Sequence, residues 1–337
     1  MLPNSSAALV NASTPPPTAT AEEIAAADLI SSANLVYSLL AAAAFVAGCF
    51  LLYVFVHTYR AHRRLAWLDR LLWAFCGLQL LLLLFSFYNV VHRPRSLRTA
   101  ALGCAALSFA INAVSLGGLL VLALMAYVLT FDPSSNYLMK RPGVCAALVA
   151  LTSAFVSLLL AGVRGPGEAL YREADCSMDP LDAGVSYAVA KLCLTFLIPY
   201  ALQLTLVICG CVRQRKSNWR FVSSSDEGPA FLAVSATLLF CHLLYTTVLV
   251  RGARLRARGE LSHRERALAS VAELVFFAGS GASLVLVALT HRPSRERLCG
   301  LFRRLADCCP RAAHPQPNRN IITPHIEIAD TLQDIES

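Results

Sequence analysis

Charged residues are scarce in this sequence. Asp, Glu, Lys and Arg make up 15% of its 337 residues, whereas about a quarter is usual in a soluble globular protein. Hydrophobic residues reach 56%, so much of the apolar surface must face something other than water. This imbalance argues against a soluble enzyme or binding module and favours a protein that resides in lipid.

Sequence signatures of catalysis and of metal binding are also absent. The chain has no phosphate-binding glycine loop, no CxxC spacing among its 12 cysteines, and no Ser, His and Asp set at a catalytic spacing. Cys308 and Cys309 are adjacent, which is not a zinc-binding pattern. We therefore expect no enzymatic activity, no cofactor and no metal site.

The net charge of +8 raises the question of a nucleic-acid partner. The arginines, however, cluster at the ends of apolar runs, where they anchor membrane spans against lipid headgroups. The sequence has no basic stripe with interleaved aromatic residues on a soluble module. Membrane lipid is therefore the expected partner, and nucleic acid is not.

Residues 1–33 are polar and rich in Ser, Thr, Ala and Pro, which predicts a disordered tail. The tail lacks the basic start and early apolar run of a signal peptide. It carries two glycosylation sequons, at Asn4 and Asn11, and the rest of the chain has none. Two sequons in one tail predict that this tail is extracellular and glycosylated.

Seven apolar runs follow the tail, and each is long enough to cross a bilayer as a helix. Their length and the absence of period-2 alternation exclude strands, and a helix satisfies every backbone group internally, as lipid demands. We predict an all-α membrane protein, a seven-transmembrane helix bundle over residues 34–291, with Pro199 kinking the fifth helix. The runs cover residues 34–58, 71–92, 102–130, 144–163, 185–210, 230–250 and 268–290.

The distribution of lysine and arginine predicts which side of the membrane each connection occupies. Residues 1–33 contain neither, whereas the connections 59–70, 131–143 and 211–229 are basic and are expected in the cytoplasm. We predict a multi-pass protein of the plasma membrane with an extracellular N-terminus. The connection 251–267 is an exception, because it falls outside the cell yet holds six arginines. It is either a simple solvated loop or a region that attracts an acidic ligand.

The segment 292–306 has apolar residues at helical spacing among arginines. This pattern predicts an amphipathic helix on the membrane surface with its basic face toward anionic lipid. Cys299, Cys308 and Cys309 lie in or beside this segment, and they are either palmitoylated or free thiols. Residues 307–337 are polar and are expected to form a disordered cytoplasmic tail.

Two cysteines are expected on the oxidising side of the membrane. Cys104 stands at the start of the third run, and Cys176 stands between the fourth and fifth runs. A disulfide between them would tie that loop over the mouth of the bundle and lower the entropy of the unfolded chain. Two free thiols are the alternative.

The seven spans, the sequons in a short outer tail, this cysteine pair and the basic segment after the last span together resemble the rhodopsin-like (class A) G-protein-coupled receptors. Residues 196–200 (FLIPY) are similar to the family's proline-bearing fifth helix. Residues 240–245 (FCHLLY) resemble its sixth-helix F-x-C-W-x-P-Y segment, and Tyr127 with residues 131–133 resembles the end of its third helix. The resemblance implies an orphan-type cell-surface receptor that signals through a heterotrimeric G protein or an arrestin-like protein.

Several positions depart from the family's pattern. Residues 125–127 (Met-Ala-Tyr) stand where the family has Asp-Arg-Tyr, and residues 287–291 stand where Asn-Pro-x-x-Tyr is expected. His242 and Leu244 replace the family's Trp and Pro, and Gln79 lies near the position of a sodium-binding aspartate. These departures favour atypical or constitutive coupling. A non-signalling scaffold or decoy and, with less support, a transporter are the alternatives.

Polar and ionisable side chains inside membrane spans are the first candidates for function, because they are expensive to bury. Asn112, His242 and Tyr245 come from the third and sixth runs, which face the bundle centre by resemblance. With Lys191 in the fifth run and Glu273 in the seventh, they predict a half-polar ligand pocket open to the outside. The alternatives are hydrogen bonds between helices for Asn112 and His242. For Lys191 the alternative is outward snorkelling; an inward Lys191 would meet either a ligand carboxylate or Glu273. For Glu273 the alternative is headgroup contact.

Basic residues continue the fifth run into the cytosol. Arg213, Arg215 and Lys216 follow its apolar part, and Tyr127 lies at the inner end of the third run. All four are candidates for contact with the acidic surface of a signalling partner. Anchoring of the spans by the positive-inside rule is the alternative.

Overall fold

The structure of the chain, a computed structural model, describes residues 20–63, 66–91, 101–131, 141–163, 181, 183–217 and 228–308. Within these residues all regular structure is helical. The elements are α1 (Ala21–His62), α2 (Trp67–Val91), α3 (Ala101–Thr130), α4 (Pro142–Val163), α6 (Gly184–Lys191), the π-helical turn η2 (Leu192–Leu197), α7 (Ile198–Ser217), α8 (Gly228–Ala257), α9 (His263–Thr290) and α10 (Arg292–Cys308).

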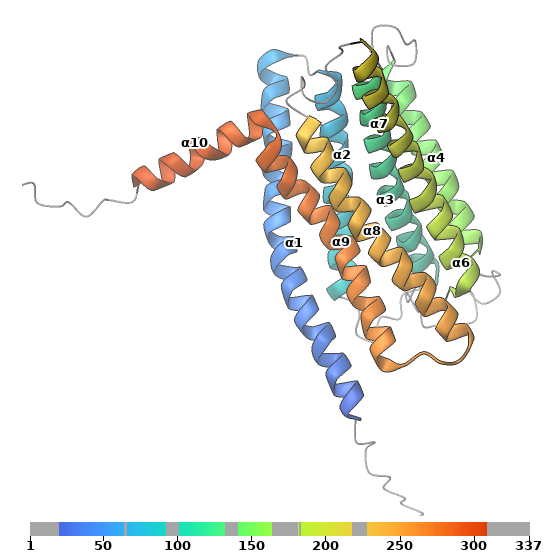
Figure 1. The fold of residues 1–337 in the computed structure, drawn as a ribbon. Coiled ribbons are helices and arrows are strands. Elements are labelled where there is room, and N and C mark those ends of the chain that lie inside the picture. The colour runs from blue at the N-terminus through green and yellow to red at the C-terminus, as the bar shows by residue number, and fades with distance from the viewer. Residues whose placement is uncertain are drawn as a thin grey trace, which may run out of the picture. The chain divides into compact units, whose positions relative to one another are not determined.

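The helices from α1 to α9 form one bundle, in which α6, η2 and α7 follow one another without a break (Figure 1). The described residues include seven helices that are long and apolar enough to cross a membrane. The predicted all-α class and the seven spans are therefore confirmed. The helix predicted after the last span is confirmed as well and is α10. Contacts within the chain divide it into two units, Met1–Glu296 with the bundle and Arg297–Ser337.

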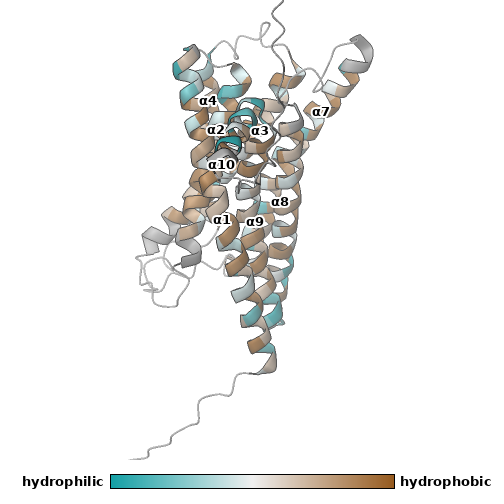
Figure 2. Cartoon of the chain, turned by 90° about the vertical axis from the view of Figure 1, so that its left-hand side faces the viewer, coloured by the Kyte–Doolittle hydropathy of each residue, from teal (hydrophilic) through white to brown (hydrophobic). Residues whose placement is uncertain are grey.

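The outward-facing side chains of the spans are apolar. On α4, for example, Leu151, Phe155 and Leu158 are 68%, 61% and 60% exposed. Figure 2 shows hydrophobic residues along the lengths of the helices and hydrophilic residues gathered mainly near their ends. A soluble monomer rarely exposes so continuous an apolar surface. Lipid is therefore the solvent that this surface fits.

The first helix begins earlier than the sequence predicted. Thr20 caps α1 in a capping box with Glu23: its side chain accepts from the Glu23 N–H, and the Glu23 carboxylate accepts from the Thr20 N–H. The prediction that residues 21–33 are disordered is therefore wrong. At 42 residues, α1 is about 63 Å long, roughly twice the thickness of the hydrocarbon core of a bilayer. Glu23 also pairs with His263 at the start of α9, at 3.3 Å.

The seventh span, α9, packs against α1, α2 and α8, and α3 packs against α2, α4 and α7. Small residues let α9 approach its neighbours closely. A Cβ atom added at Gly281 would lie 2.9 Å from the Cβ of Ala44 on α1. One added at Gly279 would lie 2.9 Å from the Cβ of Cys241 on α8. These positions require glycine because the neighbouring atoms are rigid.

The fifth span departs from regular α-helical geometry just before its proline. The Ile198 N–H donates to the carbonyl of Cys193, five residues earlier, as a π-helical turn requires. A proline clashes with the carbonyl four residues before it in a regular helix, and the wider turn η2 ends at Leu197, two residues before Pro199. The sequence predicted a kink at Pro199, and the structure places a π-helical turn, which the sequence did not predict, just before that proline. Such turns are frequent at functional sites.

The connection between α8 and α9 is shorter than predicted. Helix α8 runs to Ala257 and α9 begins at His263, so residues 258–262 form the turn rather than 251–267. Gly259, with φ +74°, takes the left-handed conformation that ends α8. The Gly259 N–H donates to the Arg256 carbonyl and the Glu260 N–H to the Leu255 carbonyl, both at 3.0 Å, which completes the cap.

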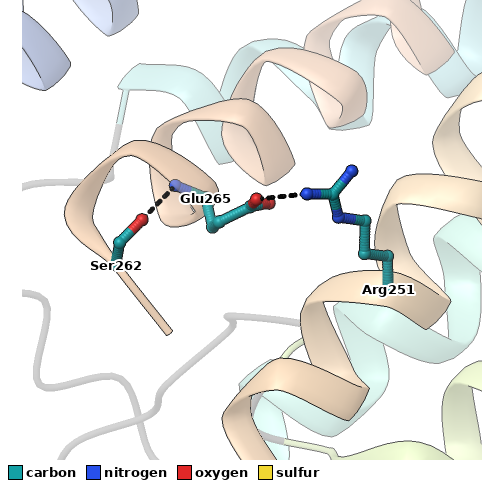
Figure 3. Close-up of polar contacts among 3 residues, drawn as sticks. All are labelled: Arg251, Ser262 and Glu265. Atoms are coloured by element: carbon teal, nitrogen blue, oxygen red, sulfur yellow. Dashed lines mark hydrogen bonds and ion pairs between the residues drawn. The ribbon is translucent and has the colours of Figure 1, made fainter. Parts of the chain in front are cut away.

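A side-chain cap and an ion pair hold the start of α9 (Figure 3). Ser262 caps the helix by accepting a hydrogen bond of 3.2 Å from the Glu265 N–H. The Glu265 carboxylate accepts a hydrogen bond of 2.7 Å from Arg251, near the end of α8. The Arg251 side chain is 68% exposed, so this ion pair adds little stability. We call this end of the bundle the turn end and the opposite end the far end.

Candidate functional site

A buried lysine lies in the half of the bundle nearest the turn end. Lys191 is the last residue of α6, directly before η2, and is only 8% exposed. Its ammonium donates a hydrogen bond of 3.2 Å to the hydroxyl of Tyr245 on α8. It also lies 5.0 Å from the centre of the Tyr245 ring and 5.7 Å from that of Tyr187, one turn earlier on α6. The alternative in which Lys191 snorkels outward is therefore wrong.

The same group of side chains reaches α3. The Asn112 side-chain amide is 5% exposed and donates a hydrogen bond of 3.3 Å to the Tyr187 hydroxyl. Asn112, Tyr187, Lys191 and Tyr245 thus connect α3, α6 and α8, and we call these four residues the Lys191 cluster. The sequence predicted three of them. Tyr187 was missed, although its position four residues before Lys191 places it on the same helix face.

An aromatic group continues from the Lys191 cluster toward the middle of the bundle. Phe276 on α9 packs against Tyr245 and His242, with ring centroids 5.0 and 4.9 Å apart. His242 also meets Tyr200 on α7 edge-to-face, at 6.0 Å. The structure thus brings the predicted His242 next to the cluster through ring contacts. Phe276 and Tyr200 were not among the predicted site residues.

Glu273 lies near the Lys191 cluster without pairing with it. It is half-buried on α9 and acts electrostatically on Lys191, Tyr245 and Tyr37. Among the described residues, no carboxylate lies within 4.0 Å of the Lys191 ammonium, and no Asp or Glu side chain is buried. A buried charge is normally paired or fully hydrogen-bonded. Lys191 therefore lacks a protein counter-ion at contact distance in the described part of the chain.

A second buried polar contact joins the first two spans. Tyr37 on α1 and Ser86 on α2 share a hydrogen bond through their hydroxyls, and both are buried. The Ser86 hydroxyl is also bonded to the Leu83 carbonyl at 2.6 Å. Glu273 is within electrostatic range of both Tyr37 and Lys191. Neither Tyr37 nor Ser86 was among the predicted site residues.

At the far end, the predicted coupling residues meet through an aromatic residue. Tyr127 packs on Phe131 with ring centroids 4.9 Å apart, and the Arg213 guanidinium lies 5.8 Å from the Phe131 ring. Nearby, the Thr130 hydroxyl is within 3.0 Å of the Leu206 carbonyl, which ties α3 to α7. The structure thus brings Tyr127 and Arg213 together. The side chains of Arg215 and Lys216 lie outside the described residues.

A buried histidine occupies the junction between α9 and α10. His291 is 3% exposed, and its Nδ1 lies 2.9 Å from the Ser294 hydroxyl. Its Nε2 lies 3.5 Å from Asp69 on α2, and its ring packs on Phe55 of α1 at 5.1 Å. Three spans therefore meet at His291. From the sequence, His291 was only part of the segment that stands where the resembled family has its seventh-helix motif, and it was not a predicted site residue.

Several predicted sites lie outside the described side chains. Asn4, Asn11, Cys176 and Cys309 fall outside the described residues altogether. Cys104 lies in α3 and Cys308 in α10, but their side chains are not described. Cys299 is exposed on α10. No group of His, Cys, Asp or Glu side chains in the described ranges is arranged to hold a metal ion.

The bundle is similar to a solved structure of squid rhodopsin, with a TM-score of 0.62. The match covers 84% of this chain and 87% of the rhodopsin chain, at 11% sequence identity. No protein-family model matches the sequence, and no curated protein sequence matches it. At this identity the similarity establishes the fold: the chain has the seven-helix fold of a rhodopsin.

Proposed function

We propose that the chain is a cell-surface receptor of the G-protein-coupled type, with a ligand site at the Lys191 cluster. The observation that carries the proposal is a buried ammonium, tied to α8 and, through Tyr187, to α3, inside a rhodopsin fold. Ionisable groups inside a membrane bundle are expensive and mark binding or transport sites. A ligand that contacts this cluster contacts three spans at once.

The π-helical turn supports a link between this cluster and the rest of the fifth span. Lys191 precedes η2 directly, and the Thr195 hydroxyl within η2 donates to the Lys191 carbonyl at 2.8 Å. A ligand that moves Lys191 therefore acts on a turn that already departs from α-helical geometry. In the proposed mechanism the ligand shifts the populations of two arrangements of the bundle, and η2 is an element that rearranges.

The far end is the proposed surface for a G protein or an arrestin-like partner. The contacts of Thr130 with Leu206 and of Phe131 with Arg213 hold α3 and α7 together there. Opening of this end would break them, because the partner must enter between the spans. Tyr127, Arg213, Arg215 and Lys216 are the proposed coupling residues.

The proposed topology places the N-terminus and the turn end outside the cell, in the plasma membrane. The sequons at Asn4 and Asn11 and the lysine-free and arginine-free tail support it. Glycans at both asparagines, a disulfide between Cys104 and Cys176, and palmitoylation of Cys299, Cys308 and Cys309 belong to the same proposal. An electrophoretic shift on glycosidase treatment that disappears in the Asn4→Gln, Asn11→Gln double variant tests the orientation.

A dissociation assay for each class of heterotrimeric G protein, with arrestin recruitment in parallel, tests the proposed function in cells. The expected result is a basal or evoked signal above that of empty vector at verified surface expression. A chain that reaches the surface and gives no signal with any transducer contradicts the proposal.

One observation favours a second candidate, a seven-helix scaffold that does not signal. Met125 and Ala126 occupy the positions where the resembled family has Asp and Arg, and both are fully buried. At these positions, α3 therefore offers a partner no charged side chain. Absence of coupling in the assay, together with capture of stable membrane partners, is the result that the scaffold predicts.

A further inference from the structure

We propose that the ligand of the Lys191 cluster is a monocarboxylate carried on an aromatic or alkyl body, with the Lys191 ammonium as its anchor. The inference rests on the proposed function, since it names the class of ligand for that site. It depends on four features of the structure: the hydrogen bonds that the cluster leaves open, its charge, the rings around it and the arginines at the turn end.

The ammonium of Lys191 has more donors than the protein satisfies. An ammonium carries three N–H donors, and within the described residues only the Tyr245 hydroxyl accepts one of them. Tyr245 uses its oxygen as the acceptor, and its own O–H proton has no acceptor among the described side chains. Two ammonium hydrogens and one hydroxyl hydrogen, on two neighbouring groups, thus have no acceptor among the described residues. The two oxygens of a carboxylate can accept from both groups together.

The charge of the cluster selects a single negative charge. Lys191 is the only buried lysine or arginine among the described residues. Glu273 already places a carboxylate within electrostatic range of it. A monocarboxylate adds one negative charge beside Lys191 and Glu273, whereas a phosphate monoester dianion adds two, and the low dielectric strengthens the repulsion of each added charge from Glu273. A carboxylate fits this balance better than a phosphate.

The surroundings of the ammonium favour an apolar body behind the carboxylate. The rings of Tyr187 and Tyr245 flank Lys191, and Phe276 and His242 continue the aromatic surface toward the bundle centre. Aromatic side chains offer large apolar contact areas and preferred stacking geometries. A ligand with an aryl or alkyl part can therefore contact these rings while its carboxylate reaches Lys191.

The turn end, which is the end of the bundle nearer the cluster, carries positive charge. Leu181, just before α6, would lie 2.8 Å from a Cβ atom at Gly252 near the end of α8, so α6 begins at the turn end. Six exposed arginines surround this end, and we call them the arginine collar. They are Arg251, Arg254, Arg256, Arg258, Arg264 and Arg266. A cluster of one sign raises the local concentration of ions of the opposite sign and speeds their association.

Thermal unfolding of the purified full-length protein in nanodiscs tests the inference without any signalling partner. The probes are phenylpropionate, octanoate and oleate, each compared with its primary alcohol and its primary amide, and octyl phosphate as the dianionic comparison. We expect at least one carboxylate to raise the unfolding temperature of the wild type, with no comparable rise from its alcohol, its amide or octyl phosphate.

Variants then assign the effect to Lys191. Lys191→Gln and Tyr245→Phe should lower the apparent affinity for that carboxylate about tenfold or more, because each loses a charge-assisted hydrogen bond. Lys191→Arg keeps the charge and should retain binding, which shows that a loss in Lys191→Gln is not simple misfolding. Arg70→Gln removes an exposed cation on α2, away from the cluster, and serves as the matched control with unchanged affinity.

Three results would overturn the inference: no rise with any carboxylate, an equal rise with the alcohol or amide, or an undiminished rise in Lys191→Gln. A larger, Lys191-dependent rise with octyl phosphate would overturn the choice of a monoanion. These outcomes are separate from the coupling assay. A chain that activates a G protein but shows no preference for carboxylates keeps the receptor proposal and loses only this one.

Discussion

At the scale of single residues, the candidate site depends on the direction in which Lys191 points. The sequence identified Lys191, Asn112, His242 and Tyr245 because polar residues stand out in apolar runs. It did not decide whether Lys191 faces lipid or the bundle. That direction depends on helix rotation and on the neighbouring turn η2, and neither can be read from composition. The inward ammonium, bonded to Tyr245, is what makes the site a candidate for function.

A double-mutant cycle tests the bond between Lys191 and Tyr245. Tyr245→Phe leaves the buried ammonium without its acceptor and should lower the free energy of unfolding by about 1–3 kcal/mol. Lys191→Met keeps the length of the side chain, removes the buried charge and should be neutral or stabilising. The double variant should then be more stable than the sum of the two single effects predicts, in chemical unfolding of the detergent-solubilised protein. If the two single effects simply add, the side chains do not interact.

At the scale of helices, the sequence predicted the spans well and their ends less well. An apolar window finds the part of a helix that lies in lipid, so it misses polar continuations such as residues 21–33 of α1 and 251–257 of α8. The signals for these ends were present. Thr20 with Glu23 forms a capping box, and Gly259 marks the end of α8. Gly259 as the end of α8 predicts that Arg251 lies on that helix and not in a loop.

Close packing of α9 on α1 gives a prediction at this scale. Gly281→Ala places a Cβ atom 2.9 Å from the Cβ of Ala44, so it should destabilise the bundle by about 1–3 kcal/mol. Gly77→Ala on α2 is the matched control, because its Cβ meets nothing within 4 Å, and alanine is the better helix former by about 1 kcal/mol. Thermal unfolding should therefore show opposite signs for the two variants. A shared sign would mean that α1 and α9 do not pack as described.

The hydrogen bond between α3 and α7 gives a second prediction at the scale of helices. Thr130→Val removes the hydroxyl bonded to the Leu206 carbonyl. If that bond stabilises the closed far end by about 1 kcal/mol, its loss should raise the open population, and with it basal coupling, about fivefold. Thr205→Val is the control, since the exposed Thr205 hydroxyl bonds only to the Ala201 carbonyl of its own helix. Equal basal signals from both variants at equal surface expression would contradict a role for this tie.

At the scale of the whole molecule, two ends of one bundle carry different chemistry. The turn end holds the arginine collar and is the end nearer the Lys191 cluster, and the far end holds the contacts between α3 and α7. The sequence predicted the fold because seven long apolar runs leave few other solutions in lipid. It did not predict Tyr187, Phe276 or the contacts of His291, because these depend on which helices are neighbours. Such contacts are set by packing between spans and not by patterns along one span.

The arginine collar makes a prediction about the approach of a ligand. Changing Arg254, Arg258 and Arg264 to glutamine should slow the association of a carboxylate that stabilises the wild type, with little effect on its dissociation. The difference should shrink as ionic strength rises, because salt screens exposed charges. Association rates measured by stopped flow at low and high salt provide the test. If the variant and the wild type have the same association rate at low salt, the arginine collar does not attract the ligand and is only a solvated part of the helix ends.

The most direct measurement of the whole account is G-protein dissociation in cells that express the wild type, Lys191→Gln or Thr205→Val at equal surface levels. We expect a wild-type signal above empty vector, an altered signal in Lys191→Gln, and no change in Thr205→Val. A silent wild type, or a Lys191→Gln variant that signals like the wild type, would contradict the claim that this buried lysine controls the far end of the bundle.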